Sequence, residues 1–184
     1  MKEQLFTQFQ TVGRDLFRSR LISSHGGNLS VRVGDTIYIT RSGCQLAHLT
    51  PDDIVAVPVV APVTAGNGDV LPSSELVVHR ALYAAREAES GATTGAVVHA
   101  HSLHTTARSF THDIIVPCDF EAKLLIAQTP VVETRDAISA PLVPLVVVRG
   151  HGPFAQADTL EDAYQLVSVL EHSCELLDII ECSA

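Results

Sequence analysis

The chain has 184 residues and a formal net charge of −9, with 46% hydrophobic and 18% charged residues. This length suits one domain with a substantial core, and the composition is that of a folded protein rather than a disordered one. The 12 lysines and arginines are scattered, which argues against nucleic acid or an anionic membrane as a partner. An anionic ligand would therefore bind in a pocket, to backbone N–H groups and hydroxyls.

The four cysteines follow neither a zinc-binding spacing nor a compact disulfide framework, so free thiols in a reducing cytosol are expected. The N-terminus shows no signal peptide. No apolar run reaches the roughly 18 residues that a membrane span needs. These features favour a cytoplasmic protein.

Apolar periodicity and turn residues predict the elements of the first half of the chain. They are a helix over residues 3–20, a β-hairpin of strands 29–33 and 36–40, a helical turn at 50–53, a strand over 54–60 and a turn at 65–69.

Strands and helices alternate in the second half. The expected elements are a helix from residue 75 to about 89, a strand over 94–101, helices over 102–109 and 120–127, strands over 114–117, 130–133 and 142–149, and a helix from 159 to about 180. The pattern predicts one α/β domain over residues 1–184, with a mainly antiparallel sheet covered by helices in three layers.

His99 and His101 end the central predicted strand. Side chains alternate along a strand, so both imidazoles are expected on the same side. Two such rings repel when protonated and lose hydration when buried, and a divalent metal is the simplest partner that makes the pair favourable. The alternative is a strand end with two solvated histidines.

His151 lies between Gly150 and Gly152, after the strand over 142–149. Taken alone it is typical of a turn histidine, although the glycines let the backbone bend and a ligand approach. Together with His99 and His101 it provides three imidazoles and one open position, as in a catalytic zinc site.

Ser73 and Ser74 are expected at the cap of a helix, with Glu75 in its first turn, where a negative charge is favoured. Ordinary capping explains this triplet. The same helix end could instead hold a phosphate, with Glu75 as a metal ligand or general base. His79 lies one turn further on the same face and is expected to support Glu75 or to pack.

Two polar loops, Gly27-Asn28 and Ser42-Gly43, flank the hairpin. They could bind an anion, or they could be ordinary turns at the ends of the hairpin. No glycine-rich nucleotide-binding motif is present. The remaining histidines have no spacing that requires a site, and neither Cys44 nor Cys118 has a nearby base that would make it a nucleophile.

Five segments in this order resemble the class II aldolase and adducin family, most closely its compact archaeal-type L-fuculose-1-phosphate aldolases. The segments are Gly27–Arg32, Ile39–Gly43, Pro72–Glu75, Val98–Ser102 and Arg149–Gly152. The resemblance implies a zinc-dependent aldehyde-lyase. It would cleave a ketose 1-phosphate such as L-fuculose 1-phosphate, through a zinc-stabilised enediolate, to dihydroxyacetone phosphate and a small aldehyde such as lactaldehyde.

The resemblance also implies roles for individual residues. Zinc (or another divalent metal) would be bound by His99, His101 and His151, with Glu75 as the fourth ligand and the acid/base. The phosphate would be held by Asn28, Ser42, Gly43, Ser73 and Ser74, with Gly27 shaping the loop. The family fold is a mostly antiparallel sheet flanked by helices, usually in a homotetramer with active sites at subunit interfaces.

The sequence departs from the family pattern in two places, and both bear on which aldehyde the enzyme would release. Fuculose-phosphate aldolases use a tyrosine from a neighbouring subunit as a proton donor, but the matching segment here, Pro117–Glu121, has none. Asp119 or Glu121 could take a related role. The stretch between Glu133 and Val143 is also too short for the helix that family members usually place there.

Other reactions on the same scaffold remain alternatives. They are pentulose-phosphate 4-epimerisation, sugar-acid-phosphate decarboxylation and methylthioribulose-phosphate dehydration. A non-catalytic adducin-like interaction domain would be expected to have lost the metal ligands, which are present here.

Overall fold

The computed structural model of the chain describes residues 3–60, 70–133 and 143–183. Its strands are β1 (Asn28–Val33), β2 (Thr36–Thr40), β3 (Ile54–Pro58), β4 (Thr94–His99), β5 (Ile114–Ile115), β6 (Thr129–Val132), β7 (Leu145–Val148) and β8 (Gly152–Ala157). Its helices are α1 (Glu3–Arg18), α2 (Leu76–Ser90), α3 (Leu103–Ser109), α4 (Phe120–Leu125) and α5 (Leu160–Cys182), with short 3-10 turns η1 (Leu46–His48) and η2 (Pro51–Asp53).

The strands form one sheet in the order β3-β2-β1-β4-β8-β7-β6-β5. Neighbouring strands are antiparallel apart from the parallel pair β6 and β7. The predicted α/β class with a mostly antiparallel sheet is therefore confirmed. Within the described ranges, no helix is both long and apolar enough to cross a membrane.

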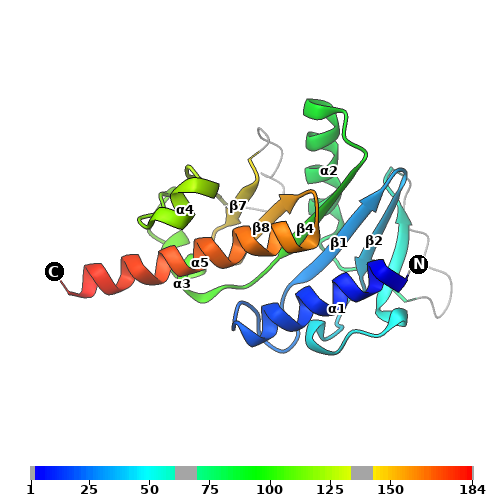
Figure 1. Cartoon of the computed structure of the whole chain (residues 1–184), viewed down its shortest axis with the longest axis horizontal. Coiled ribbons are helices and arrows are strands. Elements are labelled where there is room, and N and C mark those ends of the chain that lie inside the picture. The colour runs from blue at the N-terminus through cyan, green and yellow to red at the C-terminus, as the bar shows by residue number, and fades with distance from the viewer. Residues whose placement is uncertain (1–2, 61–69, 134–142, 184) are drawn as a thin grey trace.

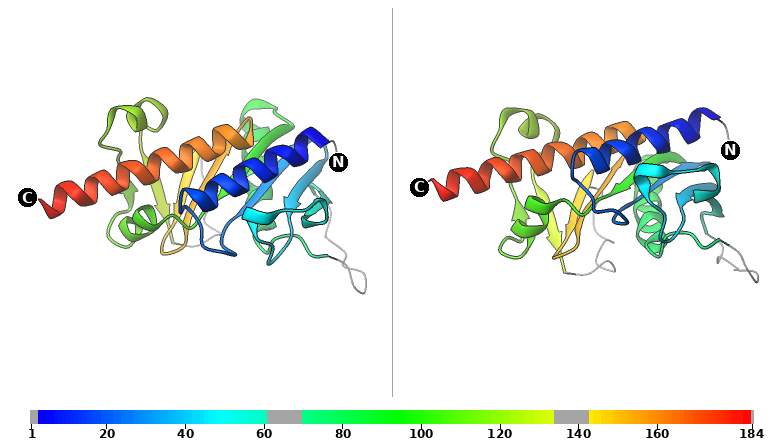
Figure 2. Two further views of the ribbon diagram at one scale, coloured as in Figure 1. Left: turned by 60° about the horizontal axis from the view of Figure 1, so that its bottom comes forward. Right: turned by 90° about the horizontal axis from the view of Figure 1, so that it is seen from below.

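Helices cover both faces of the sheet (Figures 1 and 2). Helices α1 and α5 lie side by side on one face, and α2 lies on the other. Strand β4 divides its side chains accordingly: Ala96 and Val98 pack in the cluster under α1 and α5, and Val97 packs in the cluster under α2. The strict alternation of a strand thus builds two cores from one segment and turns His99 toward the α2 side.

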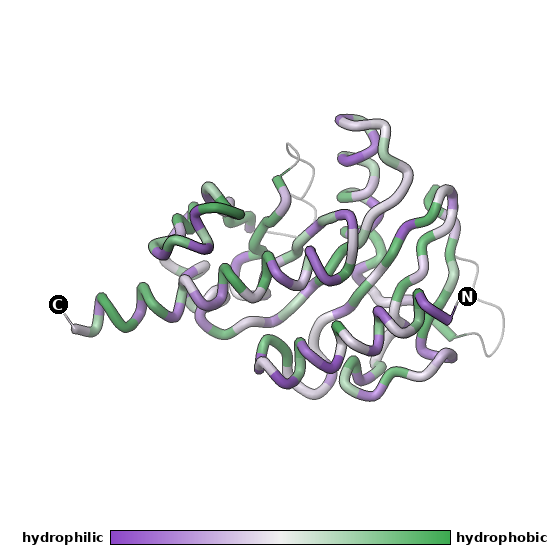
Figure 3. The backbone as a smooth tube through the Cα atoms, viewed as in Figure 1, coloured by the Kyte–Doolittle hydropathy of each residue, from purple (hydrophilic) through white to green (hydrophobic). Residues whose placement is uncertain are grey.

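Figure 3 shows how hydropathy is distributed along the chain. Hydrophobic and hydrophilic residues are mixed along the central strands, and several hydrophobic residues lie in the last turns of α5, which extend past the sheet. Ile179 and Ile180 in those turns are more than half exposed.

Several predicted ends differ from the observed ones; two of these differences bear on the site, and one strand was not predicted. Strand β4 ends at His99 rather than His101, because the His101 N–H bonds to the Leu21 carbonyl, outside the sheet. Helix α2 begins at Leu76, so Glu75 is its N-cap residue and both serines precede the helix. The sequence pattern missed β8, whose alternation is hidden by small residues and a proline. The turn predicted at 65–69 and the segment 134–142 lie outside the described residues.

Candidate metal centre and anion pocket

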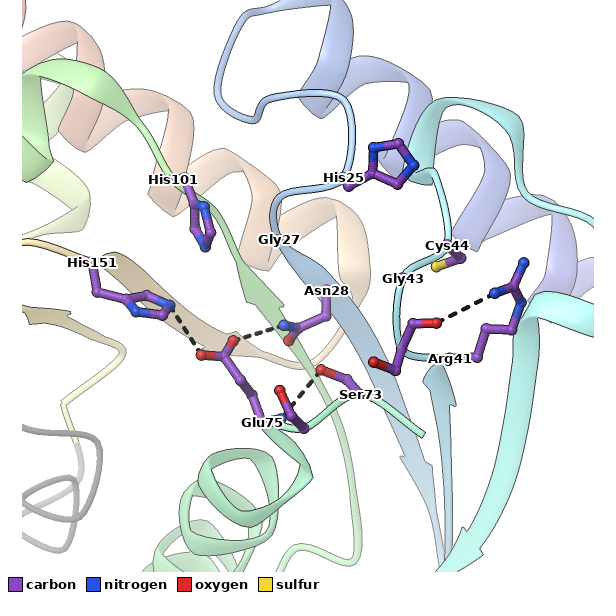
Figure 4. Close-up of a pocket in the computed structure, with 12 residues that line it drawn as sticks. His25, Gly27, Asn28, Arg41, Gly43, Cys44, Ser73, Glu75, His101 and His151 are labelled. Carbon is purple, nitrogen blue, oxygen red and sulfur yellow. Dashed lines mark hydrogen bonds and ion pairs between the residues drawn. The ribbon is translucent and has the colours of Figure 1, made fainter. Parts of the chain in front are cut away.

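The three predicted histidines meet at one point, and Figure 4 shows two of them, His101 and His151, on the same side of the pocket as Glu75. The Nε2 atom of His99 lies 3.0 Å from that of His101 and 2.9 Å from that of His151. His101 lies two residues beyond the end of β4, and its imidazole still converges with that of His99. One ligand atom from each ring lies within 4.8 Å of the others.

Gly152 explains how His151 reaches this point. His151 lies in the tight turn between β7 and β8, where its N–H bonds to the Val148 carbonyl. Gly152 has φ +142°, and a Cβ atom there would lie 2.2 Å from the Ala100 carbonyl oxygen. Only glycine lets β8 start so close to the end of β4.

The ring of His99 is fixed from two sides. It stacks on Phe154, with the ring centroids 3.9 Å apart, and its Nδ1 atom lies 2.9 Å from the Pro153 carbonyl oxygen. A carbonyl only accepts, so Nδ1 carries the proton and the Nε2 lone pair faces the other histidines. Burial lowers the pKa of His99 to about 3, so the ring is neutral at pH 7.

Glu75 completes the cluster from the start of α2. Its carboxylate oxygens lie 3.2 Å from His99 Nε2 and 2.9 Å from His151 Nε2, and the amide of Asn28 donates to it at 2.7 Å. Burial alone would raise the pKa of Glu75, but the bond with His151, the charge interaction with His99 and the Asn28 amide together lower it to about 2. Glu75 is therefore a buried carboxylate at neutral pH.

This donor set fits a divalent cation. The lone pair of a neutral His99 faces an ionised carboxylate oxygen at 3.2 Å, an arrangement that is unfavourable without a positive charge between them. Around a tetrahedral zinc with bonds of about 2.0–2.1 Å, ligand atoms are roughly 3.3 Å apart. The separations of 2.9–3.2 Å that join His99 to His101, His151 and Glu75, and Glu75 to His151, are close to that spacing. The backbone carbonyl on Nδ1 of His99 is also a typical outer partner of a metal-binding histidine.

A cavity of about 280 Å³ opens beside these side chains (Figure 4). All six residues predicted to bind phosphate line it, together with Glu75, His101 and His151: Gly27, Asn28, Ser42, Gly43, Ser73 and Ser74. Segments that are distant in the sequence thus share one pocket, with the histidines and the carboxylate toward one end.

Hydrogen bonds within the protein limit which groups of these loops are available to bind an anion. The backbone N–H groups of Ser42 and Ser73 donate to the carbonyls of Leu71 and Thr40, which tie the two loops together. The Ser73 hydroxyl accepts from the Glu75 N–H at 3.3 Å. Ser42 and Ser73 can therefore offer a ligand their hydroxyls but not their backbone N–H groups.

Sequence reasoning missed three residues that line the same cavity: His25, Arg41 and Cys44. Arg41 is held at the wall by Asp53, whose Oδ1 atom lies 2.6 Å from the guanidinium Nε. Arg41 is a cationic side chain beside the proposed anion site. The only sequence signal for these three cavity residues was that they lie close to Asn28 or Ser42 in the chain.

Asp119 and Glu121 lie elsewhere in the chain. Asp119 caps α4, accepting from the Ala122 N–H at 2.9 Å, and Glu121 is exposed on that helix. Neither lines the cavity formed by the described residues. A role for either at a neighbouring subunit's site stays a prediction.

Comparisons with known proteins find relatives that match nearly the whole chain. An L-fuculose phosphate aldolase of Methanocaldococcus jannaschii is 30% identical over 177 residues, which cover 92% of this chain and 93% of that protein. A methylthioribulose-1-phosphate dehydratase of Gluconacetobacter diazotrophicus is 30% identical, with 89% and 88% covered.

Among solved structures, an L-fuculose-1-phosphate aldolase from Thermus thermophilus superposes with a TM-score of 0.84 at 33% identity, covering 98% of this chain and 96% of the other. Residues 7–177 match the family described as Class II Aldolase and Adducin N-terminal domain. The chain belongs to this family.

Proposed function

We propose that this protein is a divalent-metal-dependent aldehyde-lyase. It cleaves a ketose 1-phosphate such as L-fuculose 1-phosphate to dihydroxyacetone phosphate and a small aldehyde such as lactaldehyde. One observation carries the proposal: three histidine Nε2 atoms and the carboxylate of Glu75 converge beside a cavity lined by serine and glycine loops. Both curated relatives described above are named for reactions of sugar phosphates.

We assign metal binding and proton transfer to different residues of the cluster. His99, His101 and His151 would hold the cation, zinc being the expected metal. A cation bound there would act as a Lewis acid toward the enediolate that carbon–carbon cleavage leaves. Glu75, ionised and adjacent to that position, is placed to accept the proton that the hydroxyl loses as it becomes the aldehyde and to pass a proton to the carbon that loses its bond, and to do the opposite in the reverse direction.

The rest of the cavity would orient the substrate. Asn28, Ser42, Gly43, Ser73 and Ser74 would bind the phosphate, and Gly27 shapes the loop by adopting φ +77° beside the His99 carbonyl. When the phosphate is bound at one end of the cavity, the reacting carbons of the substrate are held at a fixed distance from it. Arg41 lies in the same wall, where its guanidinium is paired with Asp53.

We propose a cytoplasmic homotetramer with active sites at subunit interfaces. Apolar side chains around α4 and the end of α5 are more than half exposed, which supports a contact surface between copies. They include Phe110, Val116, Phe120, Leu124, Ile179 and Ile180.

Methylthioribulose-phosphate dehydration is the second candidate, because a relative with that name matches at 30% identity. It would use the same metal and phosphate residues. An epimerase or a decarboxylase would share them too, whereas a non-catalytic adducin-like domain has no need of the complete set of three histidines and Glu75.

A product screen separates these candidates. The metal-loaded protein is incubated with dihydroxyacetone phosphate and a series of short aldehydes, and separately with methylthioribulose 1-phosphate. We expect condensation with at least one aldehyde. Dehydration, epimerisation or decarboxylation without any condensation would replace the aldolase assignment with one of the alternatives.

A further inference from the structure

Behind Asn28, a line of buried polar groups leads away from the cavity under α2. The Asn28 Oδ1 atom lies 2.5 Å from His79 Nε2, and His79 Nδ1 lies 2.6 Å from the Ser30 hydroxyl. Ser30 in turn lies 2.8 Å from the Tyr83 hydroxyl. Ser30, His79 and Tyr83 are at most 1% exposed. Asn28 therefore links the His79 ring to the Glu75 carboxylate.

The donor and the acceptor in each bond of this line follow from the Glu75 carboxylate at one end. A carboxylate can only accept, so Asn28 presents its NH₂ group to Glu75 and its carbonyl oxygen to His79. His79 must then carry its proton on Nε2. Burial lowers the pKa of His79 to about 4, so the ring is neutral and its Nδ1 accepts from the Ser30 hydroxyl.

Tyr83 is the last donor in this line of hydrogen bonds. The Ser30 hydroxyl has one proton and donates it to His79, so it can only accept from the Tyr83 hydroxyl. Burial raises the pKa of Tyr83, which keeps that hydroxyl protonated. Every donor, from Tyr83 through Ser30 and His79 to Asn28, thus points toward Glu75.

We propose that Tyr83, Ser30 and His79 are positioning residues that fix the side-chain amide of Asn28 with its NH₂ group toward Glu75 and the cavity. Without the Nε2–H of His79, the amide could rotate and turn its oxygen against the carboxylate and against a bound anion. The inference deepens the proposed function, on which it rests for the roles of Asn28 and Glu75.

A purely structural role would require only that buried polar groups find partners. Two substitutions of His79 separate the roles, because the amide nitrogen of Gln is placed near Nε2 of histidine and that of Asn near Nδ1. His79→Gln keeps a donor to Asn28, whereas His79→Asn keeps a polar group only near Ser30. Both variants are neutral and polar.

The first measurement is the affinity of the metal-free protein for inorganic phosphate, by calorimetry. One hydrogen bond to a charged group corresponds to roughly tenfold in affinity. We expect His79→Asn to bind phosphate about tenfold more weakly than the parent, and His79→Gln to stay within about threefold. Equal losses in both variants would overturn the proposal.

The second measurement needs no variant. Long-range proton–nitrogen NMR of the ¹⁵N-labelled, metal-free protein reports which nitrogen of His79 is protonated. We expect the Nε2–H tautomer. An Nδ1–H tautomer in the parent would overturn the proposal even if the variants fail to fold. Failure of the aldolase assignment would appear in the product screen and leave this tautomer unchanged.

Discussion

Asn28 and His99 lie opposite each other in the antiparallel register of β1 and β4. This pairing joins the proposed phosphate loop to the buried member of the histidine cluster. Glu75 contacts both residues, at 2.7 Å from the Asn28 amide and 3.2 Å from His99 Nε2. One cross-strand pair and one helix start therefore connect the anion pocket to the metal ligands.

Replacing Glu75 should separate metal binding from catalysis. Glu75→Gln leaves the three imidazoles in place, so we expect it to retain metal far better than His101→Ala. Turnover should nevertheless fall by roughly 100-fold or more, since Gln carries no transferable proton. Metal content and steady-state kinetics on the same samples check this, with His48→Ala as a control histidine outside the cavity. Wild-type turnover in Glu75→Gln would remove Glu75 from the mechanism.

Gly152 should resist substitution more than other glycines with positive φ. In Gly152→Ala the new Cβ would lie 2.2 Å from the Ala100 carbonyl oxygen, and we expect a loss of about 3 kcal/mol or more in the free energy of unfolding. Gly34 has φ +60° with open space around it, so Gly34→Ala should cost only about 1 kcal/mol. Urea denaturation measures both. Similar costs would show that the close approach to Ala100 is not a constraint.

Asp53 should make stability depend on pH. Its burial would raise its pKa, but bonds from Thr50 and Arg41 outweigh this and leave the pKa below the usual value. The pKa is therefore lower in the folded than in the unfolded chain, and the stabilisation is complete above about pH 4 and lost below it. We expect Asp53→Asn to be less stable than the parent by about 1–2 kcal/mol at pH 7, with a smaller difference at pH 3.

The control for Asp53 is Asp52→Asn, which changes the same charge at an exposed neighbour. Urea denaturation of both variants and the parent at the two pH values gives the comparison. A difference for Asp53→Asn that does not shrink on acidification would contradict the proposed ionised, hydrogen-bonded state.

Local signals predicted most of the fold. The apolar periodicity of α1, the alternation on both sides of Gly34-Asp35 and the turn residues between elements each depend on near neighbours in sequence. Strand β8 was missed because Gly-Pro-Phe-Ala-Gln-Ala has little strand character, and the strand forms by pairing with both β4 and β7.

The site was predicted in part for a similar reason. His99 and His101 are two residues apart and predicted a metal pair without further information. The residue types suggested His151 as a third ligand and Glu75 as a ligand or base, but the convergence of these two residues on the pair depends on strand order, and the family resemblance was needed to assign all four to one site. Ser30 and Tyr83 are 53 residues apart and gave no signal, since only the packing of α2 on β1 brings their hydroxyls together.

The metal content of the purified protein tests the central claim most directly. Elemental analysis of wild type, His101→Ala and His48→Ala is done before and after dialysis against a chelator and re-addition of zinc. We predict about one divalent ion per chain in wild type and in His48→Ala, restored after zinc addition, and almost none in His101→Ala. Only a small fraction of an ion per chain in zinc-treated wild type, or equal content in all three proteins, would contradict the account.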